Sequence, residues 1–80
     1  MTYQRRRSEV AAGEVRALLG RNRESIEDLS SATGIPLSTL KRRLLLKTDF
    51  TIDEIELIAR HYGVTYNSVV YAPQEVEAAS

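Results

Sequence analysis

The most chemically suggestive stretch of this sequence is a run of cationic side chains between residues 37 and 47. Lys41, Arg42, Arg43 and Lys47 lie there with no acidic residue among them. Lysine and arginine donate hydrogen bonds to anionic oxygens, and the arginine fork also matches the paired acceptors of a guanine edge. Because a basic run is also common on any solvated helix surface, its meaning depends on the elements that position it.

Charge is distributed unevenly along the 80 residues, although 11 basic and 11 acidic side chains give a formal net charge of zero. Arginines dominate residues 1–23, whereas from residue 48 onward the only lysine or arginine is Arg60. A neutral protein with one basic face can still be steered onto phosphate. We therefore expect a mobile basic arm at residues 1–8, the alternative being a solvated terminus without a role.

Several classes of site find no support in the composition. The chain contains no cysteine, so disulfides and thiolate metal sites are excluded. The single histidine, His61, belongs to no metal-ligand or nucleophile motif. Neither a membrane-length apolar run nor the apolar region of a signal peptide is present. We expect a non-enzymatic cytoplasmic, nucleoid-associated protein that uses no metal or cofactor and binds no small-molecule ligand.

A short helix with clear start and stop signals precedes the basic run. Ser25 and Asp28 have the spacing of a capping box, in which each side chain accepts a hydrogen bond from the other residue's backbone amide. Gly34 comes where this helix must end, because glycine readily adopts the positive φ of a helix C-terminus. The sequence therefore predicts a tight turn at Gly34.

A second short helix follows the turn and carries the basic run itself. Pro36 suits its first turn, where the missing backbone N–H costs nothing. Leu40 and Leu44, one turn apart, indicate its buried face, and Lys41 and Arg42 occupy another. Two short helices joined by a glycine turn are typical of a helix-turn-helix.

Three further helices are predicted from capping patterns and apolar spacing. They cover about residues 9–19, 51–62 and 65–71. The second of them begins with a capping box formed by Thr51 and Glu54. No segment shows the period-two alternation of a half-buried strand. We therefore expect a compact all-α fold of five short helices.

The helices are expected to form one domain at residues 9–72, followed by a flexible tail at residues 73–80. Ser8 is the predicted N-cap of the first helix. Gly13 inside that helix costs about 1 kcal/mol relative to alanine. It either permits a close approach of another backbone or is simply tolerated.

Residues from about 9 to 71 resemble the Cro/repressor-type (XRE-like) family of helix-turn-helix DNA-binding domains. The capped segment at residues 50–64 also resembles the fourth helix of that family. The residues that carry the resemblance through their spacing are Ser25, Leu29, Gly34, Ile35 and Leu40. The resemblance implies a lambda-repressor-like fold.

The chain departs from the family pattern at two positions. Ser30 stands where the family usually has alanine, and serine is still small enough for two helices to cross closely. Arg43 stands where an apolar residue is common, and Leu44 takes the buried role one position later. The second departure leaves open which of Lys41, Arg42 and Arg43 faces outward.

The resemblance implies that the helix at about residues 36–46 enters the major groove of DNA. The expected base contacts are Leu37, Ser38, Thr39, Lys41 and Arg42. The expected contacts to the DNA backbone are Arg5, Arg6, Arg7, Asn22, Arg23, Ser25, Arg43, Lys47 and Thr48. A solvated surface remains the alternative for the cations, and packing against the preceding helix remains the alternative for Leu37.

The function implied is that of a phage or bacterial transcriptional regulator, in the manner of a repressor, which binds double-stranded DNA at a two-fold operator. Since one recognition helix reads few base pairs, we expect a weak homodimer. The interface candidates are Leu57, Tyr66, Val70 and Tyr71. Their alternative role is ordinary closure of a small core.

Two other functions compete with the regulator. One is an excision-control or antitoxin-like accessory factor, in which DNA binding assists a bound protein partner. The other is a helical adaptor that binds no DNA and uses the acidic half of the chain from Asp49 onward. Loss of function on replacing the basic run would exclude the adaptor.

Overall fold

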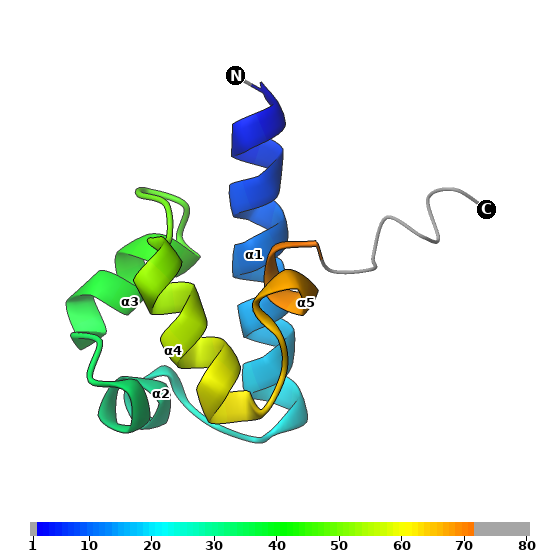
Figure 1. The fold of residues 1–80 in the computed structure, drawn as a ribbon. Coiled ribbons are helices and arrows are strands. Elements are labelled where there is room, and N and C mark those ends of the chain that lie inside the picture. The colour runs from blue at the N-terminus through cyan, green and yellow to red at the C-terminus, as the bar shows by residue number, and fades with distance from the viewer. Residues whose placement is uncertain (1, 72–80) are drawn as a thin grey trace.

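The computed structural model describes residues 2–71 and shows five α-helices and no strand among them (Figure 1). The all-α class predicted from the sequence is therefore confirmed for this part of the chain, and the predicted tail at residues 73–80 lies outside it. No helix among these residues is long and apolar enough to cross a membrane. The helices are α1 (Thr2–Arg21), α2 (Ile26–Thr33), α3 (Leu37–Leu44), α4 (Ile52–Tyr62) and α5 (Tyr66–Val70).

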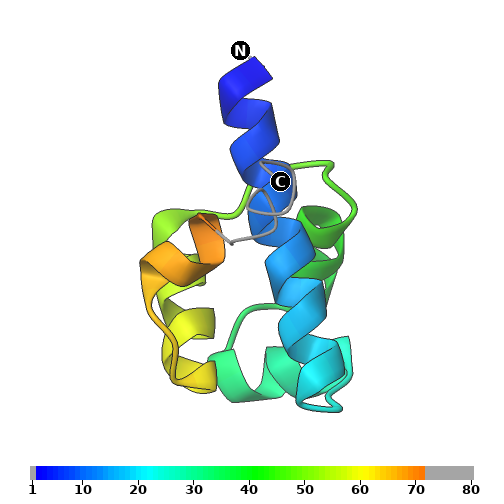
Figure 2. The same cartoon turned by 90° about the vertical axis from the view of Figure 1, so that its right-hand side faces the viewer.

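Every helix contributes to one hydrophobic core. Helix α1 packs against α3 on one side and α5 on another, while α2 and α4 close the remaining side (Figures 1 and 2). Burial of each large apolar side chain contributes about 1.5–3 kcal/mol, so all five helices are held in place by the same cluster. The largest fully buried side chains, one from each helix, are Val15, Leu29, Leu40, Ile58 and Val69.

Helix α1 begins at Thr2, so the predicted helix start at about residue 9 and the predicted cap at Ser8 are wrong, and residues 2–8 of the predicted basic arm are helical. No proline or glycine interrupts the chain before Gly13, and arginine and glutamine are good helix formers. The first turns of α1 project beyond the other helices (Figures 1 and 2). Arg7 is held by Tyr71, whose hydroxyl accepts a hydrogen bond of 2.7 Å from the Arg7 guanidinium.

Both predicted capping boxes are present. The Ser25 hydroxyl accepts a bond of 3.0 Å from the Asp28 amide, and the Asp28 carboxylate accepts one of 3.0 Å from the Ser25 amide. Thr51 and Glu54 form the same pair of bonds at 3.1 and 2.9 Å. The starts of α2 and α4 are thus fixed by local side chains.

Four helix ends use a residue with positive φ, and only two of these residues are glycine. Gly34 (φ +83°) and Gly63 (φ +70°) end α2 and α4 as predicted. Arg23 (φ +54°) and Leu46 (φ +64°) end α1 and α3. At each of these two, backbone bonds from that residue and the next close the last turn, as in a Schellman motif. These bonds compensate for a backbone conformation that disfavours a side chain.

Gly13 and Gly34 predict opposite effects for the same substitution. A Cβ at Gly13 would meet no atom within 4 Å, so this glycine is tolerated and does not serve a close approach. We expect Gly13→Ala to raise the free energy of unfolding by about 0.5–1 kcal/mol. Gly34→Ala should lower it by about 1 kcal/mol, because alanine would adopt positive φ there.

Urea unfolding of the two variants and the wild type measures both effects under the same conditions. A loss of stability in Gly13→Ala would show that α1 requires a glycine at this position for a reason other than space.

Candidate nucleic-acid interface

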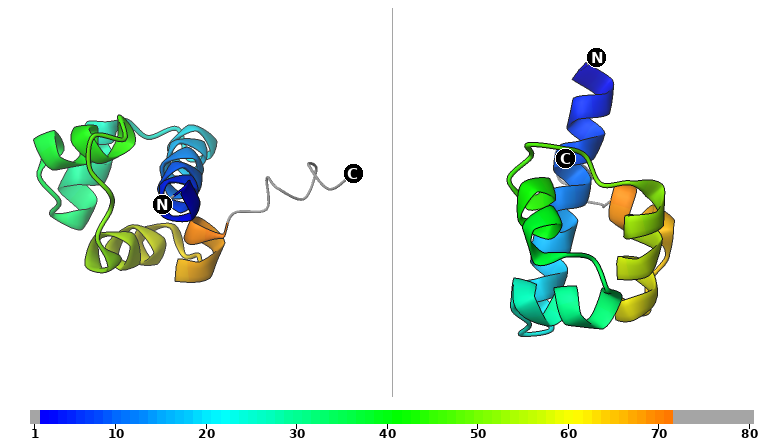
Figure 3. Two further views of the ribbon diagram at one scale, coloured as in Figure 1. Left: turned by 90° about the horizontal axis from the view of Figure 1, so that it is seen from above. Right: turned by 90° about the vertical axis from the view of Figure 1, so that its left-hand side faces the viewer.

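The rotation of α3 about its axis is set by two buried leucines. Leu40 has 0% and Leu44 has 3% of its surface exposed, and both lie in the common core. Ser38, Lys41 and Arg42 lie on other faces of the helix and are exposed. Helix α3 lies at the edge of the molecule (Figure 3, left), which agrees with the exposure of these side chains. The sequence prediction of a buried and a polar face is confirmed here.

Arg43 is turned toward α4 and bound there. Its Nε lies 2.8 Å from Glu54 Oε1, and a terminal nitrogen lies 2.9 Å from Oε2, which makes a bidentate ion pair. The two side chains are only 16% and 15% exposed. Arg43 also donates a hydrogen bond of 2.5 Å to the Thr48 hydroxyl. The structure therefore gives Arg43 an internal role in place of the DNA backbone contact expected from the sequence.

The ion pair shifts the ionisation of both partners. The pKa of Glu54 lies below its ordinary value, chiefly because its carboxylate accepts hydrogen bonds from Arg43; the backbone bond from Thr51 adds to this, and partial burial opposes it. The pKa of Arg43 is raised by the same bonds. One carboxylate thus joins the last turn of α3 to the N-terminal cap of α4.

Leu37 and Thr39, which were also expected to contact bases, are less exposed to solvent than Lys41 and Arg42. Leu37 and Thr39 are each half-buried at the start of α3. Their side chains can offer only part of their surface to a ligand. The exposed polar surface of α3 is therefore concentrated on Ser38, Lys41 and Arg42.

The loop after α3 holds one more cation. Lys47 is exposed, and its backbone amide donates a bond of 3.0 Å to the Arg42 carbonyl, which fixes the loop against the end of α3. Thr48 is exposed, but its hydroxyl accepts the bond from Arg43. Lys47 is thus the better-placed of the two for binding an anion.

Arg16 of α1 is a cation beside α3 that sequence reasoning missed. Its guanidinium donates a hydrogen bond to the Leu44 carbonyl at the end of α3. Arg16 and Lys41 also border one groove of about 520 Å³, whose wall is otherwise apolar. The sequence alone does not indicate this contact, because only the crossing of α1 and α3 brings residues 16 and 44 together.

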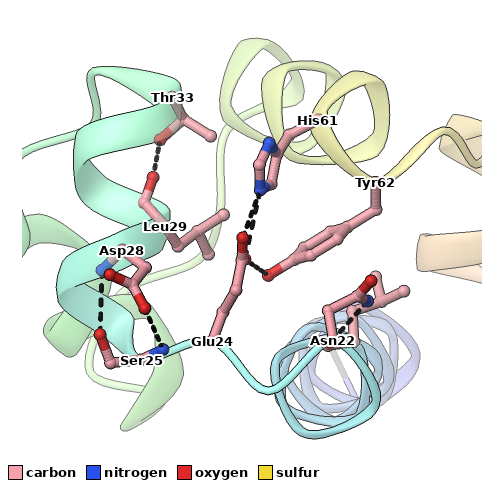
Figure 4. Close-up of polar contacts among 9 residues, drawn as sticks. Asn22, Glu24, Ser25, Asp28, Leu29, Thr33, His61 and Tyr62 are labelled. Atoms are coloured by element: carbon pink, nitrogen blue, oxygen red, sulfur yellow. Dashed lines mark hydrogen bonds and ion pairs between the residues drawn. The ribbon is translucent and has the colours of Figure 1, made fainter.

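Two of the predicted backbone contacts before α2 are satisfied within the protein (Figure 4). The Asn22 side-chain amide donates a bond of 2.8 Å to the Leu18 carbonyl. The Ser25 hydroxyl is taken up by the helix cap. Arg23 is exposed and makes no ion pair among residues 2–71. Arg23 is thus the one of these three residues whose side chain is left to bind a phosphate.

Glu24 forms a cluster that the sequence did not predict (Figure 4). Its carboxylate lies 3.0 Å from Nε2 of His61 and accepts a bond of 2.8 Å from the Tyr62 hydroxyl. Burial, followed by the Glu24 contact, raises the pKa of Tyr62. These contacts, between residues 37 and 38 positions apart, hold the end of α4 against the α1–α2 connector.

Arg7 lies away from α3. The Arg7 guanidinium lies 4.4 Å from the centre of the Tyr71 ring, next to α5. Arg5 and Arg6 belong to α1, and their predicted contacts to the DNA backbone lie outside the side chains that the structure describes. The structure therefore separates Arg7 from the cations of α3.

The four predicted interface residues fall into different environments. Val70 is 5% exposed and belongs to the core, so its assignment to an interface is wrong: its ordinary role is core closure. Tyr66 is half-buried and packs against the same core. Tyr71 and Leu57 are exposed at 52% and 40%. Of the four, only Leu57 on α4 and Tyr71 at the end of α5 are thus exposed enough to contact a partner.

No protein-family model, curated protein or solved structure shows significant similarity to this chain. Among residues 2–71, no group of three histidine, aspartate or glutamate side chains is arranged to hold a metal ion. The arrangement around α3 is therefore the basis for a functional assignment.

The lowered pKa of Glu54 predicts a specific loss of stability in acid. A carboxylate with a depressed folded-state pKa stabilises the fold fully above its unfolded pKa of about 4.3, and this contribution is lost as the pH falls through the folded value. Wild type should therefore lose stability below about pH 4.3 more steeply than Glu54→Gln.

Urea unfolding at a series of pH values tests this. Glu56→Gln is the matched control, because Glu56 is exposed on the same helix and should retain the wild-type pH dependence. Equal slopes for wild type and Glu54→Gln would contradict the proposed strength of the ion pair.

Proposed function

We propose that this protein is a sequence-specific transcriptional regulator of the Cro/repressor (XRE-like) kind, which binds double-stranded DNA through α3. In this proposal α2 and α3 form a lambda-repressor-like helix-turn-helix, and α3 enters the major groove. The proposed partner is a two-fold operator bound by two copies of the chain, because one recognition helix reads few base pairs.

The observation that carries the proposal is the asymmetry of α3. Leu40 and Leu44 are buried on one side, whereas Lys41 and Arg42 are exposed and the helix contains no acidic residue. The ion pair of Arg43 with Glu54 attaches a further face of the helix to α4. A helix held in this way presents Lys41 and Arg42 in one fixed orientation. Sequence-specific readout requires such an orientation.

Arg42 and Lys41 are the proposed base-reading cations, with Ser38 beside them. An arginine can bond in a bidentate manner to O6 and N7 of guanine, which discriminates against other bases by about 1–3 kcal/mol. Lysine can reach the same acceptors as a single donor. The half-buried Leu37 and Thr39 are left with a flanking role.

Phosphate contacts are proposed for Arg23 and Lys47, which are both exposed. In the chain, Arg23 precedes α2 and Lys47 follows α3. The N-terminus of α2 is a weaker candidate, because Glu27 and Asp28 already place two acids in its first turn. Contacts of this kind position the protein without reading sequence.

The direct test of the proposal is selection of binding sites from a random duplex library by the purified protein. We expect an enriched motif with two-fold symmetry. An asymmetric motif would support DNA binding by a single copy, and failure to enrich any motif would overturn the proposal.

Arg42 and Lys47 should give different mutant phenotypes on the selected site. Arg42→Ala should relax preference at one base position and cost about 1–3 kcal/mol on the preferred site. Lys47→Ala should weaken all duplexes alike and reduce the dependence of log K on log salt by about one unit.

Binding isotherms at several salt concentrations, on the selected site and on a scrambled duplex, separate the two effects. Glu9→Gln on α1 is an exposed control that should change neither affinity nor specificity. Uniform weakening by Arg42→Ala would assign Arg42 to the phosphates instead.

A further inference from the structure

The outer face of α4 carries one apolar residue between two opposite charges. Asp53, Leu57 and Arg60 follow at i, i+4 and i+7, so they form one stripe along the helix. All three are exposed, and they lie opposite the buried Ile55 and Ile58. Among residues 2–71, neither Asp53 nor Arg60 makes an ion pair or a side-chain hydrogen bond. We call these three residues the α4 stripe.

We propose that the α4 stripe binds the same stripe of a second copy of this chain, with the two α4 helices antiparallel about a two-fold axis. This inference rests on the proposed function in one respect, because a two-fold operator needs two copies. It names the surface that joins them, which the operator itself does not determine.

The charge order of the stripe is self-complementary in the antiparallel arrangement. The midpoint between residues 53 and 60 falls half a residue from Leu57, which is about 0.75 Å along a helix axis. A two-fold axis there places Asp53 opposite the partner's Arg60 and Arg60 opposite the partner's Asp53. The same axis brings Leu57 close to the partner's Leu57. In a parallel arrangement, each charge would instead face its own kind.

The residues that flank the stripe define its limits. On one side, Glu54 is bound to Arg43 and the His61 ring is bound to Glu24, so both side chains already have a partner within the protein. On the other side, the exposed Glu56 borders an open groove of about 360 Å³ between α4 and α5. The two-fold axis brings Glu56 near the partner's Glu56, and this approach of like charges weakens the dimer. Asp53 and Arg60 are thus the unpaired charges on the outermost face of the helix, and Glu56 lies at its flank.

The position of α4 leaves α3 open in such a dimer. Seen from above, α3 lies at one edge of the molecule, and α4 lies along a different edge (Figure 3, left). The outer faces of the two helices therefore look in different directions. A second copy seated on α4 would not cover Lys41 or Arg42.

The interface is expected to be weak in solution. Exposed ion pairs contribute little to affinity, because water screens them, and one leucine from each copy adds a small apolar contact. Interfaces of this kind fall below about 1,200 Å² of total buried area, which is typical of transient association. Two copies held on adjacent half-sites of one operator gain a high effective concentration and so associate more fully.

The test uses charge reversal and the full chain without DNA. Asp53→Arg and Arg60→Asp should each weaken self-association about tenfold in sedimentation equilibrium, because each creates like-charge contacts at both ends of the interface. An equimolar mixture of the two variants should restore association close to the wild-type level, because the mixed dimer regains opposite charges at both ends.

Restoration in the mixture separates the interface from an effect on folding, since both variants remain present there. Glu9→Arg on α1 changes the net charge by the same amount as Asp53→Arg and should leave association unchanged. A mixture that associates no better than its components, or a wild type that stays monomeric at millimolar concentration, would overturn the inference. Because no DNA is present, failure here leaves the proposed DNA binding untouched, and absence of a DNA motif leaves the interface untouched.

Discussion

One bidentate ion pair, between Arg43 of α3 and Glu54 of α4, joins the helix that carries Lys41 and Arg42 to its neighbour. Leu40 and Leu44 set the rotation of α3 by burying one side of it, and the ion pair attaches another face of the helix to α4. It is partly shielded from water, so loss of one partner would leave a charge poorly solvated. Since Glu54 also accepts the amide of Thr51, the same carboxylate fixes the start of α4. The exposure of Lys41 and Arg42 follows from this arrangement.

Two other contacts between distant segments complete the frame around α3. Arg16 of α1 donates to the Leu44 carbonyl, which holds the end of α3 from the opposite side. Glu24 joins the α1–α2 connector to His61 and Tyr62 at the end of α4. In a core of this size each helix contributes few buried side chains, so polar contacts between helices take on much of the positioning.

Features determined by neighbouring residues could be predicted from the sequence. The capping boxes at Ser25 and Thr51 and the turn at Gly34 depend on hydrogen bonds and φ angles within four residues. The partner of Arg43 could not be predicted, because Glu54 is 11 positions away and Arg43 stands among cations. The start of α1 could not be predicted correctly, since Ser8 resembles a cap although nothing breaks the helix before it. The burial of Val70 could not be predicted, because a helix of five residues is too short to define a buried face.

The central claim is that Arg42 faces DNA while Arg43 remains bound to Glu54. Nuclear magnetic resonance resolves the two side chains separately through their Nε–H signals. A titration of the protein with its selected duplex should shift the signal of Arg42 strongly and leave that of Arg43 nearly unchanged. A strong shift of Arg43 with a constant Arg42, or no shift on α3 at all, would contradict the account.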